Sequence, residues 1–201
     1  MTIFYLVRHA VTAHTGHKLT GWAPGVHLTD EGRAQADAVA ERLARLPIKA
    51  VYSSPIDRTR ETAAPIAERL NLEVELRDDL GEVQYGKWTN RSMKTLARTK
   101  LWTQVQRWPS AARFPDGETL QETQARAVAD IAALNAEHPR GAICCVTHAE
   151  IIRLVMAHYL GVHIDLFQRI VISPASVSIL GIGTDGPRIL ALNWVADGKL
   201  D

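Results

Sequence analysis

The sequence has few of the features that mark several large classes of protein. Its 23 basic residues nearly match its 22 acidic ones, for a formal net charge of +1. Duplex-binding proteins usually carry a basic excess or a basic stripe, so this balance argues against nucleic acid as a partner. No apolar stretch approaches the roughly eighteen residues that a membrane span needs. The first residues also lack the pattern of a signal peptide, a charged segment followed by an apolar core that is cleaved. We therefore expect a cytoplasmic protein with no membrane partner.

Cysteine is nearly absent as well. The two cysteines, Cys144 and Cys145, are neighbours within the apolar run Ala142–Val146. Adjacent residues are too close for an unstrained disulfide, and one pair of thiols cannot complete a structural zinc site. We interpret both as reduced thiols in a buried strand, which agrees with a cytoplasmic setting.

The composition that remains is typical of one globular unit. Hydrophobic residues make up 46% and charged residues 22% of the 201 positions, close to globular averages. A chain of this length buries the core of about one domain. No repeat, low-complexity tract or linker divides the sequence. We expect a single domain over residues 1–201, with a helical insert at about 88–137.

Three short apolar runs are each followed by a helix-forming segment. Their shortness and polar boundaries indicate buried strands. The expected strands are Ile3–Val7, Lys49–Tyr52 and Ala142–Val146, and the expected helices cover about 30–46, 56–70 and 149–160. Such alternation implies a mostly parallel sheet with helices on both faces. We predict an α/β fold, a three-layer α/β/α sandwich with an antiparallel edge strand.

Local signals mark the ends of these elements. Thr29 is typical of a helix N-cap, Pro47 should end that helix, and Gly161 suits the end of the third helix. The insert should hold two helices, and the tail should form two strands at one edge of the sheet. The expected ranges are about 92–108 and 118–135 for the helices, and 176–193 for the two strands.

Charged and polar side chains follow directly after the three strands. Arg8 and His9 follow the first, the second leads through Ser53-Ser54 to Arg58, and His148 follows the third. Ligands of open α/β sheets bind outside the carboxyl ends of the strands, so these side chains can converge. The planar guanidinium groups of arginine match the geometry of phosphate oxygens. The sequence contains no Walker loop and no cluster of carboxylates suited to magnesium. The pattern favours phosphoryl binding without a metal or a cofactor.

Two other groups of residues have simpler interpretations. His14 and His17 share a loop that lacks a carboxylate or cysteine to complete a metal sphere, so we interpret them as polar residues at the mouth of a pocket. Trp102 and Trp108 lie among basic residues. On an amphipathic insert they more often line a core or a substrate lid than stack on nucleic acid bases.

Six sequence blocks follow one another along the chain from Ile3 to about Leu160. They are Leu6-Val7-Arg8-His9-Ala10-Val11-Thr12, Gly21-Trp22 with Leu28-Thr29-Asp30-Glu31-Gly32, Tyr52–Ala63, Leu80–Trp88, Pro115-Asp116-Gly117-Glu118-Thr119 and Val146–Arg153. In this order the blocks resemble the histidine phosphatase superfamily in its phosphoglycerate-mutase-like branch. The run Asp165–Val171 is similar to a less characterised, phosphomutase-like subfamily.

The resemblance implies a two-step phosphoryl transfer through a phosphohistidine. His9 would be the nucleophile, with its second ring nitrogen held by a backbone acceptor. Arg8, Arg58 and His148 would hold the phosphoryl oxygens. Glu82 would protonate the leaving alkoxide and then activate water. The phosphoglycerate-mutase-like fold that it implies agrees with the predicted sandwich.

The resemblance also identifies substrate-binding positions and departures from the family pattern. Beside the two arginines, the substrate-binding positions are Thr12, Thr15, Gly21 and Ala149. The family usually has glycine at positions 10 and 149, so the methyl groups there are expected to narrow the pocket or shift an amide donor. It commonly has asparagine at position 15. Glu150 places an acid near an anion site, and we expect its side chain to point away along the helix.

These observations favour a metal-independent phosphomonoesterase that acts on a small phosphorylated metabolite. The first alternative is a phosphoglycerate-type phosphomutase. The resemblance implies that mutases have a longer insert between the acid and the second histidine, and a capping tail. Here the interval from Glu82 to His148 is short, and the chain stops soon after its last strand, at Asp201. The second alternative is a catalytically weak protein that binds phosphorylated ligands. The sequence leaves the oligomeric state open, a homodimer included.

Overall fold

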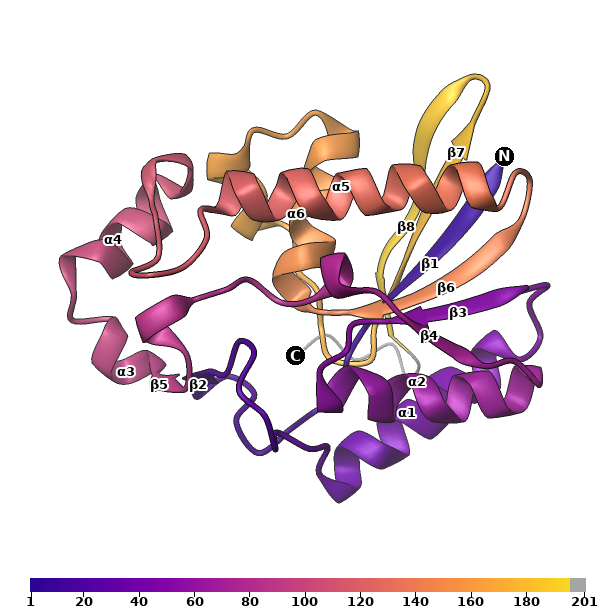
Figure 1. The fold of residues 1–201 in the computed structure, drawn as a ribbon, viewed down its shortest axis with the longest axis horizontal. Helices are drawn as coiled ribbons and strands as arrows, with labels where there is room; N and C mark the ends of the chain where they lie inside the picture. Colours follow the sequence, from indigo (N-terminus) through magenta and orange to yellow (C-terminus); the bar gives the residue numbers. More distant parts are fainter. Residues whose placement is uncertain (196–201) are drawn as a thin grey trace.

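A six-stranded sheet runs through the middle of the molecule in a computed structural model that describes residues 1–195 (Figure 1). Its strand order is β4-β3-β6-β1-β7-β8, with parallel pairing from β4 to β1 and antiparallel pairing from β1 to β8. The predicted mostly parallel sheet is therefore confirmed. The strands are β1 (Thr2–Arg8), β3 (Ala50–Ser53), β4 (Val74–Leu76), β6 (Ala142–Thr147), β7 (Val177–Gly183) and β8 (Gly186–Trp194).

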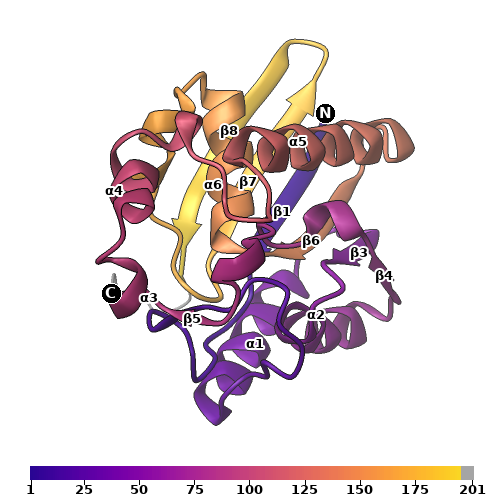
Figure 2. The ribbon, with the colours of Figure 1, turned by 60° about the vertical axis from the view of Figure 1, so that its left-hand side comes forward.

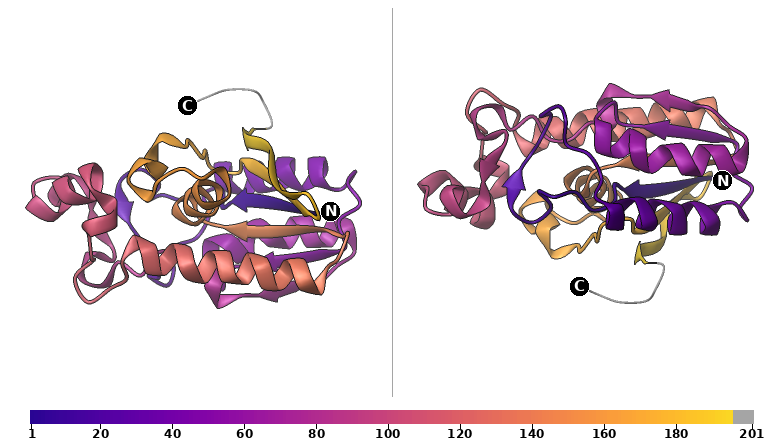
Figure 3. Two further views of the ribbon diagram at one scale, coloured as in Figure 1. Left: turned by 90° about the horizontal axis from the view of Figure 1, so that it is seen from above. Right: turned by 90° about the horizontal axis from the view of Figure 1, so that it is seen from below.

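Helices cover both faces of the sheet. Helices α1 (Asp30–Leu43) and α2 (Asp57–Leu70) lie on one face, and α5 (Leu120–Glu137) and α6 (Ala149–Leu160) on the other (Figure 3). All six residues of β6 are buried, which explains its uninterrupted apolar sequence. Because side chains alternate along a strand, Cys144 packs toward α1 and α2 while Cys145 packs toward α5 and α6. The three layers are those predicted, and both thiols are free.

The helix ends follow local capping rules. The Thr29 side chain accepts the Gly32 N–H at 3.0 Å, so the predicted N-cap is confirmed. Helix α1 ends at Leu43, four residues before Pro47, and Leu46 lies outside it, so its predicted end was too late. Gly161 ends α6 in the left-handed conformation, with φ of 68°, a backbone geometry that glycine adopts without a Cβ clash.

The helical insert differs from the single first helix that the sequence predicted. It is broken into α3 (Met93–Leu96) and α4 (Lys100–Arg107), because Thr99 starts a new helix by accepting the Trp102 N–H. These helices project beyond the end of the sheet (Figure 2). Beside them β2 (Lys18–Leu19) pairs with β5 (Arg91–Ser92). The sequence did not predict β4 or this small sheet, and both are only two or three residues long.

Short 3₁₀ helices complete the connections. They are η1 (Asp78–Leu80), η2 (Gly86–Trp88), η3 (Pro109–Ala111) and η4 (Ile164–Arg169). The tail forms the antiparallel pair β7 and β8, as predicted. Within residues 1–195 no helix is both long and apolar enough to cross a membrane.

The start of α5 gives a first testable prediction. Thr119 and Glu122 form a capping box, in which each side chain accepts the other residue's backbone N–H. Thr119→Ala should lower the free energy of unfolding by about 1 kcal/mol, because one N–H at the helix start loses its acceptor. Urea unfolding measures the change. Thr103→Ala, at an exposed position within α4, is the matched control and should stay within about 0.5 kcal/mol of the wild type.

Candidate active site

The carboxyl ends of β1, β3 and β6 meet at one edge of the sheet. The His9 N–H donates to the Thr147 carbonyl at 2.9 Å, and the Ser54 N–H donates to the Val146 carbonyl at 3.0 Å. These backbone bonds fix the segments that carry the predicted charged and catalytic side chains. The sequence-based expectation that the three strand ends converge is therefore confirmed.

A cavity of about 260 Å³ opens at this edge. His148 does not line this cavity, because its side chain is fully buried. All other residues that the sequence assigned to catalysis or substrate binding line the cavity: Arg8, His9, Thr12, Thr15, Gly21, Arg58, Glu82 and Ala149.

His9 is held in one orientation by the backbone. Its Nδ1 lies 2.8 Å from the Ala10 carbonyl oxygen, which can only accept, so Nδ1 carries the proton and Nε2 keeps a free lone pair. Burial lowers the pKa of His9 well below its usual value, and the nearby charges of Arg58 and Arg8 lower it further. The ring is therefore neutral at physiological pH, which is the form able to act as a nucleophile.

His148 is also neutral and has the opposite tautomer. Arg58 Nη2, which can only donate, lies 3.1 Å from His148 Nδ1, so the proton is on Nε2, 2.9 Å from Ser54 Oγ. Burial lowers the pKa of His148 well below its usual value, and the charge of Arg58 lowers it further. The rings of His9 and His148 meet edge to face, with centroids 5.4 Å apart.

The two arginines bring positive charge to the cavity wall. Arg58 is 1% exposed, and its Nη2 also donates to the Gly21 carbonyl at 3.0 Å. Arg8 Nη1 donates to the Ile172 carbonyl at 2.6 Å. Within residues 1–195, Arg58 Nη1 and Arg8 Nε are buried without a hydrogen-bond partner. Leaving such donors unpaired is costly, and phosphate oxygens would satisfy them.

Glu82 supplies the acid at the cavity. Its Oε1 accepts the Val83 N–H at 3.0 Å, and its Oε2 lies 3.8 Å from His148 Nδ1. Burial raises the pKa of Glu82 to about 7, and the charge of Glu150 adds to this rise. A carboxyl with this pKa is partly protonated near neutrality, so it can give a proton in one step and take one in another.

The backbone around Glu82 is fixed by residues to which the sequence assigned no role. Arg126 donates to the carbonyls of Asp79, Gly81 and Glu82 at 2.7, 2.9 and 3.0 Å. The Trp22 indole N–H also donates to the Glu82 carbonyl, at 2.6 Å. Trp22 lies in one of the six family-like blocks, but Arg126 lies in none, so no signal in the sequence pointed to it. These bonds hold the loop that carries the acid.

Gly81 is required by the same packing. A Cβ at this position would lie 2.1 Å from a ring carbon of Trp22, which is too close for any side chain. The indole therefore packs directly over the backbone next to Glu82.

Two side chains at positions that depart from the family pattern, Ala10 and Glu150, do not lie where we expected them. The Ala10 methyl packs in a small buried cluster with Leu28, Ala36 and Ala175, so it does not narrow the pocket. The Ala10 N–H is satisfied by Thr62 Oγ1 at 3.1 Å. Glu150, expected to point away, lines the cavity and pairs with Arg153. This correction follows from Arg153, whose position one turn along α6 draws the carboxylate toward the cavity.

The other residues that the sequence analysis considered lie at several places in and near the cavity. Thr15 Oγ1 accepts the Thr12 N–H at 2.9 Å and so braces the loop. His14 lines the cavity, as expected, but His17 does not. Among residues 1–195 no three His, Cys, Asp or Glu side chains are placed to hold a metal ion. Trp102 lines a neighbouring cavity, whereas Trp108 is 61% exposed, which corrects its predicted core or lid position.

Comparison with known proteins identifies the class. The family model of the histidine phosphatase superfamily (branch 1) matches residues 4–195, and the chain belongs to this superfamily. Phosphoserine phosphatase 1 of Hydrogenobacter thermophilus is 30% identical over 169 residues, covering 83% of this chain and 80% of that protein. The probable phosphoglycerate mutase GpmB of Citrobacter koseri is 30% identical over 196 residues, covering 96% and 90%.

Solved structures agree on the fold. Bacillus stearothermophilus YhfR superposes with a TM-score of 0.91 at 22% identity, covering 97% of this chain and 98% of that one. A mycobacterial glucosyl-3-phosphoglycerate phosphatase gives a TM-score of 0.86 at 23% identity, covering 96% and 98%. The likeness shows that the predicted sandwich is the histidine phosphatase fold.

The raised pKa of Glu82 predicts a pH-dependent stability. Below about pH 4.5, its ordinary value, the carboxyl is protonated in the folded and unfolded states alike, so it imposes no penalty. As pH rises toward 7, the folded state binds more protons than the unfolded state, and stability falls. Glu82→Gln should therefore gain up to about 3 kcal/mol relative to the wild type between pH 4 and pH 8, measured by urea unfolding.

Glu41→Gln is the control for this experiment. Glu41 is exposed on α1, so its difference from the wild type should be flat over the same pH range. A flat difference for Glu82→Gln as well would show that the Glu82 carboxyl has an ordinary pKa.

Proposed function

We propose that this protein is a metal-independent phosphomonoesterase that forms a phosphohistidine on His9. The observation that carries this proposal is the fixed, neutral imidazole of His9 in one cavity with Arg8 and Arg58. Within residues 1–195, two buried N–H groups of these arginines have no hydrogen-bond partner. A phosphoryl group bound to Arg8 and Arg58 would present phosphorus to His9 Nε2. His148, bonded to Arg58 and Ser54 outside the cavity lining, would act by positioning the Arg58 guanidinium.

The reaction follows in two displacements. In the first, His9 Nε2 attacks phosphorus, the bond to the alcohol oxygen breaks, and protonated Glu82 gives its proton to the leaving oxygen. In the second, Glu82, now a carboxylate, takes a proton from water as the water oxygen attacks phosphorus. The P–N bond then breaks, releasing inorganic phosphate and neutral His9. A carboxyl with a pKa of about 7 is suited to both roles.

A phosphoglycerate-type mutase is the second candidate. The observation that favours it is the 30% identity to a probable phosphoglycerate mutase over nearly the whole chain. A mutase would use the same nucleophile but would return the phosphoryl group to an organic acceptor instead of water. A weak phospho-ligand binding protein is less well supported, because the buried methyl of Ala10 leaves the cavity intact.

Trapping the phosphoenzyme tests the proposal directly. Incubation with a ³²P-labelled phosphomonoester in the presence of EDTA, followed by a rapid quench, should give an acid-labile, base-stable label. His9→Ala should abolish this label. His148→Ala should retain a label that forms about 10²–10³ times more slowly, because Arg58 loses the ring that positions its guanidinium. Equal labelling of the His9→Ala protein, or a label on serine, would reassign the nucleophile.

Esters with different leaving groups test whether Glu82 donates a proton or only positions the substrate. An alkyl phosphate has a strongly basic leaving oxygen and needs a proton, whereas an activated aryl phosphate hardly does. Glu82→Gln should slow phosphorylation by alkyl esters about 10²–10⁴-fold and by the aryl ester far less. Burst kinetics would resolve the aryl ester into fast phenol release and a slower hydrolysis step. Glu41→Gln should behave like the wild type. An equal loss for both esters would assign Glu82 a positioning role.

A further inference from the structure

A second cavity, largely apolar, adjoins the one that holds His9. Its volume is about 290 Å³. The two cavities share five lining residues, Leu19, Tyr85, Met93, Glu150 and Arg153, so they are neighbouring lobes of one site. The wall of the second lobe is built mainly from the helical insert and the segments packed on it: Trp88, Trp102, Val105, Phe114, Leu120 and Phe167.

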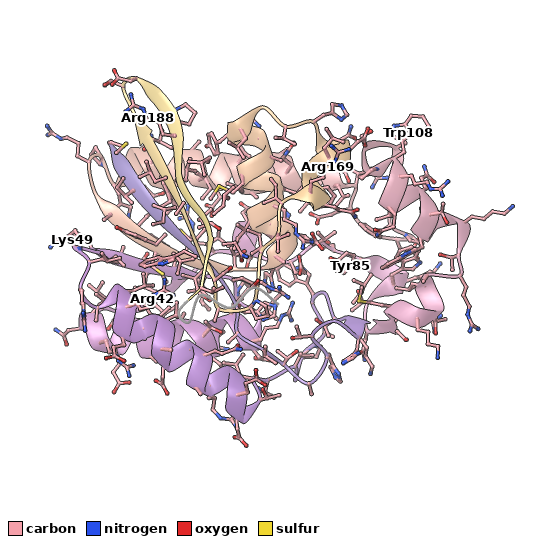
Figure 4. All side chains as sticks on the ribbon, turned by 180° about the vertical axis from the view of Figure 1, so that it is seen from behind. Arg42, Lys49, Tyr85, Trp108, Arg169 and Arg188 are labelled. Atoms are coloured by element: carbon pink, nitrogen blue, oxygen red, sulfur yellow. The ribbon has the colours of Figure 1, made fainter. Side chains whose placement is uncertain are left out.

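The aromatic wall of this lobe is firmly packed. Trp88 and Phe114 are buried, and their ring centroids lie 5.5 Å apart in an edge-to-face arrangement. Trp102 lies 6.2 Å from Trp88 with the ring planes 31° apart. The ring of Tyr85, which is labelled in Figure 4, packs edge-on against that of Phe114, with centroids 4.9 Å apart. A preformed cavity with apolar walls suits an apolar group of a ligand.

An ion pair stands where the two lobes meet. Arg153 Nη1 lies 3.2 and 3.0 Å from the two carboxylate oxygens of Glu150. Arg153 Nε donates to the Ile170 carbonyl at 2.9 Å, which fixes the guanidinium. An alcohol with a carboxylate at this point would therefore meet the negative charge of Glu150 and an arginine that is already paired. Lys18 lines the His9 lobe but not the apolar one.

We propose that the substrate is the phosphate monoester of an uncharged alcohol whose alkyl or aromatic group occupies the apolar lobe, and that Glu150 excludes carboxylated esters. This inference rests on the proposed phosphatase activity and adds the class of alcohol. The phosphoryl group would lie against Arg8 and Arg58, and the carbon chain would pass the Glu150–Arg153 pair into the lobe lined by Trp102. Specificity would then come from the insert, while the chemistry stays at the strand ends.

An alkyl phosphate series tests the apolar lobe. For ethyl, butyl, hexyl and phenethyl phosphate, kcat/KM should rise by roughly fourfold per methylene that enters the lobe, mainly through KM. Trp102→Ala should flatten this dependence: kcat/KM should fall by about tenfold for the longest esters and by much less for ethyl phosphate, whose short chain enters the lobe least. Trp108→Ala is the matched control and should keep the full dependence, because Trp108 is exposed at the outer edge of the insert (Figure 4). Val105→Ala, which changes only the wall of the apolar lobe, replaces Trp102→Ala if the latter fails to fold.

A matched pair of esters tests the exclusion by Glu150. 3-Phosphoglycerate and glycerol 3-phosphate differ only in a carboxylate in place of a hydroxymethyl group. The wild type should prefer glycerol 3-phosphate, and Glu150→Gln should raise the 3-phosphoglycerate to glycerol 3-phosphate ratio of kcat/KM by about tenfold, because the charge of Arg153 is released. Taking the ratio cancels any effect of Glu150 on the pKa of Glu82.

The outcomes separate the two proposals. Normal labelling of His9 and turnover of ethyl phosphate, together with a flat chain-length dependence, would overturn the assignment of the apolar lobe alone. A wild-type preference for 3-phosphoglycerate, or an unchanged ratio in Glu150→Gln, would overturn the exclusion. No turnover and no labelling with any ester would overturn the proposed phosphatase activity, and the substrate class with it.

Discussion

The removal of two arginine side chains from water, Arg58 fully and Arg8 in part, near the carboxyl ends of parallel strands constrains the rest of the site. Cations removed from water are costly unless they are paired, and here backbone carbonyls of Ile172 and Gly21 supply part of the compensation. Their charges also act on the histidines, because burial and nearby positive charge both disfavour imidazolium. The arginines that suit an anion therefore keep His9 in its neutral form. In the proposed mechanism, anion binding and activation of the nucleophile would therefore have one cause.

For Glu82, burial and the arginine charges shift the pKa in opposite directions. Burial raises its pKa more strongly than Arg58 and Arg8 lower it, and Glu150 adds a like charge. A raised pKa is useful only if the carboxyl stays at the cavity, and this position depends on backbone bonds rather than on the carboxyl itself. Arg126 and Trp22 hold the Glu82 carbonyl, and Arg126 is fixed in turn by Glu118 at 2.8 Å. Helix α5 thus supports the acid from outside the cavity.

The parts of the fold that the sequence predicted are those with strong local signals. The buried strand before His148 and the cap at Thr29 depend on apolar continuity and a single side chain, and both are as expected. The break at Thr99 was missed because a threonine inside a helical pattern reads equally well as an interior residue or an N-cap. The contacts of Ala10 and Glu150 were misjudged for a different reason: each depends on residues brought close by packing, which sequence spacing does not reveal.

This difference also explains why the sequence predicted residues for a phosphoryl site but no class of alcohol. The proposed phosphoryl site uses arginine forks and ring nitrogens near strand ends, where topology alone brings Arg8, Arg58 and His9 together. The proposed alcohol site depends on side-chain packing between separate segments, as where Trp88 of η2 meets Trp102 of α4. An aromatic residue in an insert has the same sequence signature whether it packs into a core or lines a cavity. Only the arrangement of the helices separates Trp102, in the wall, from the exposed Trp108 six residues later.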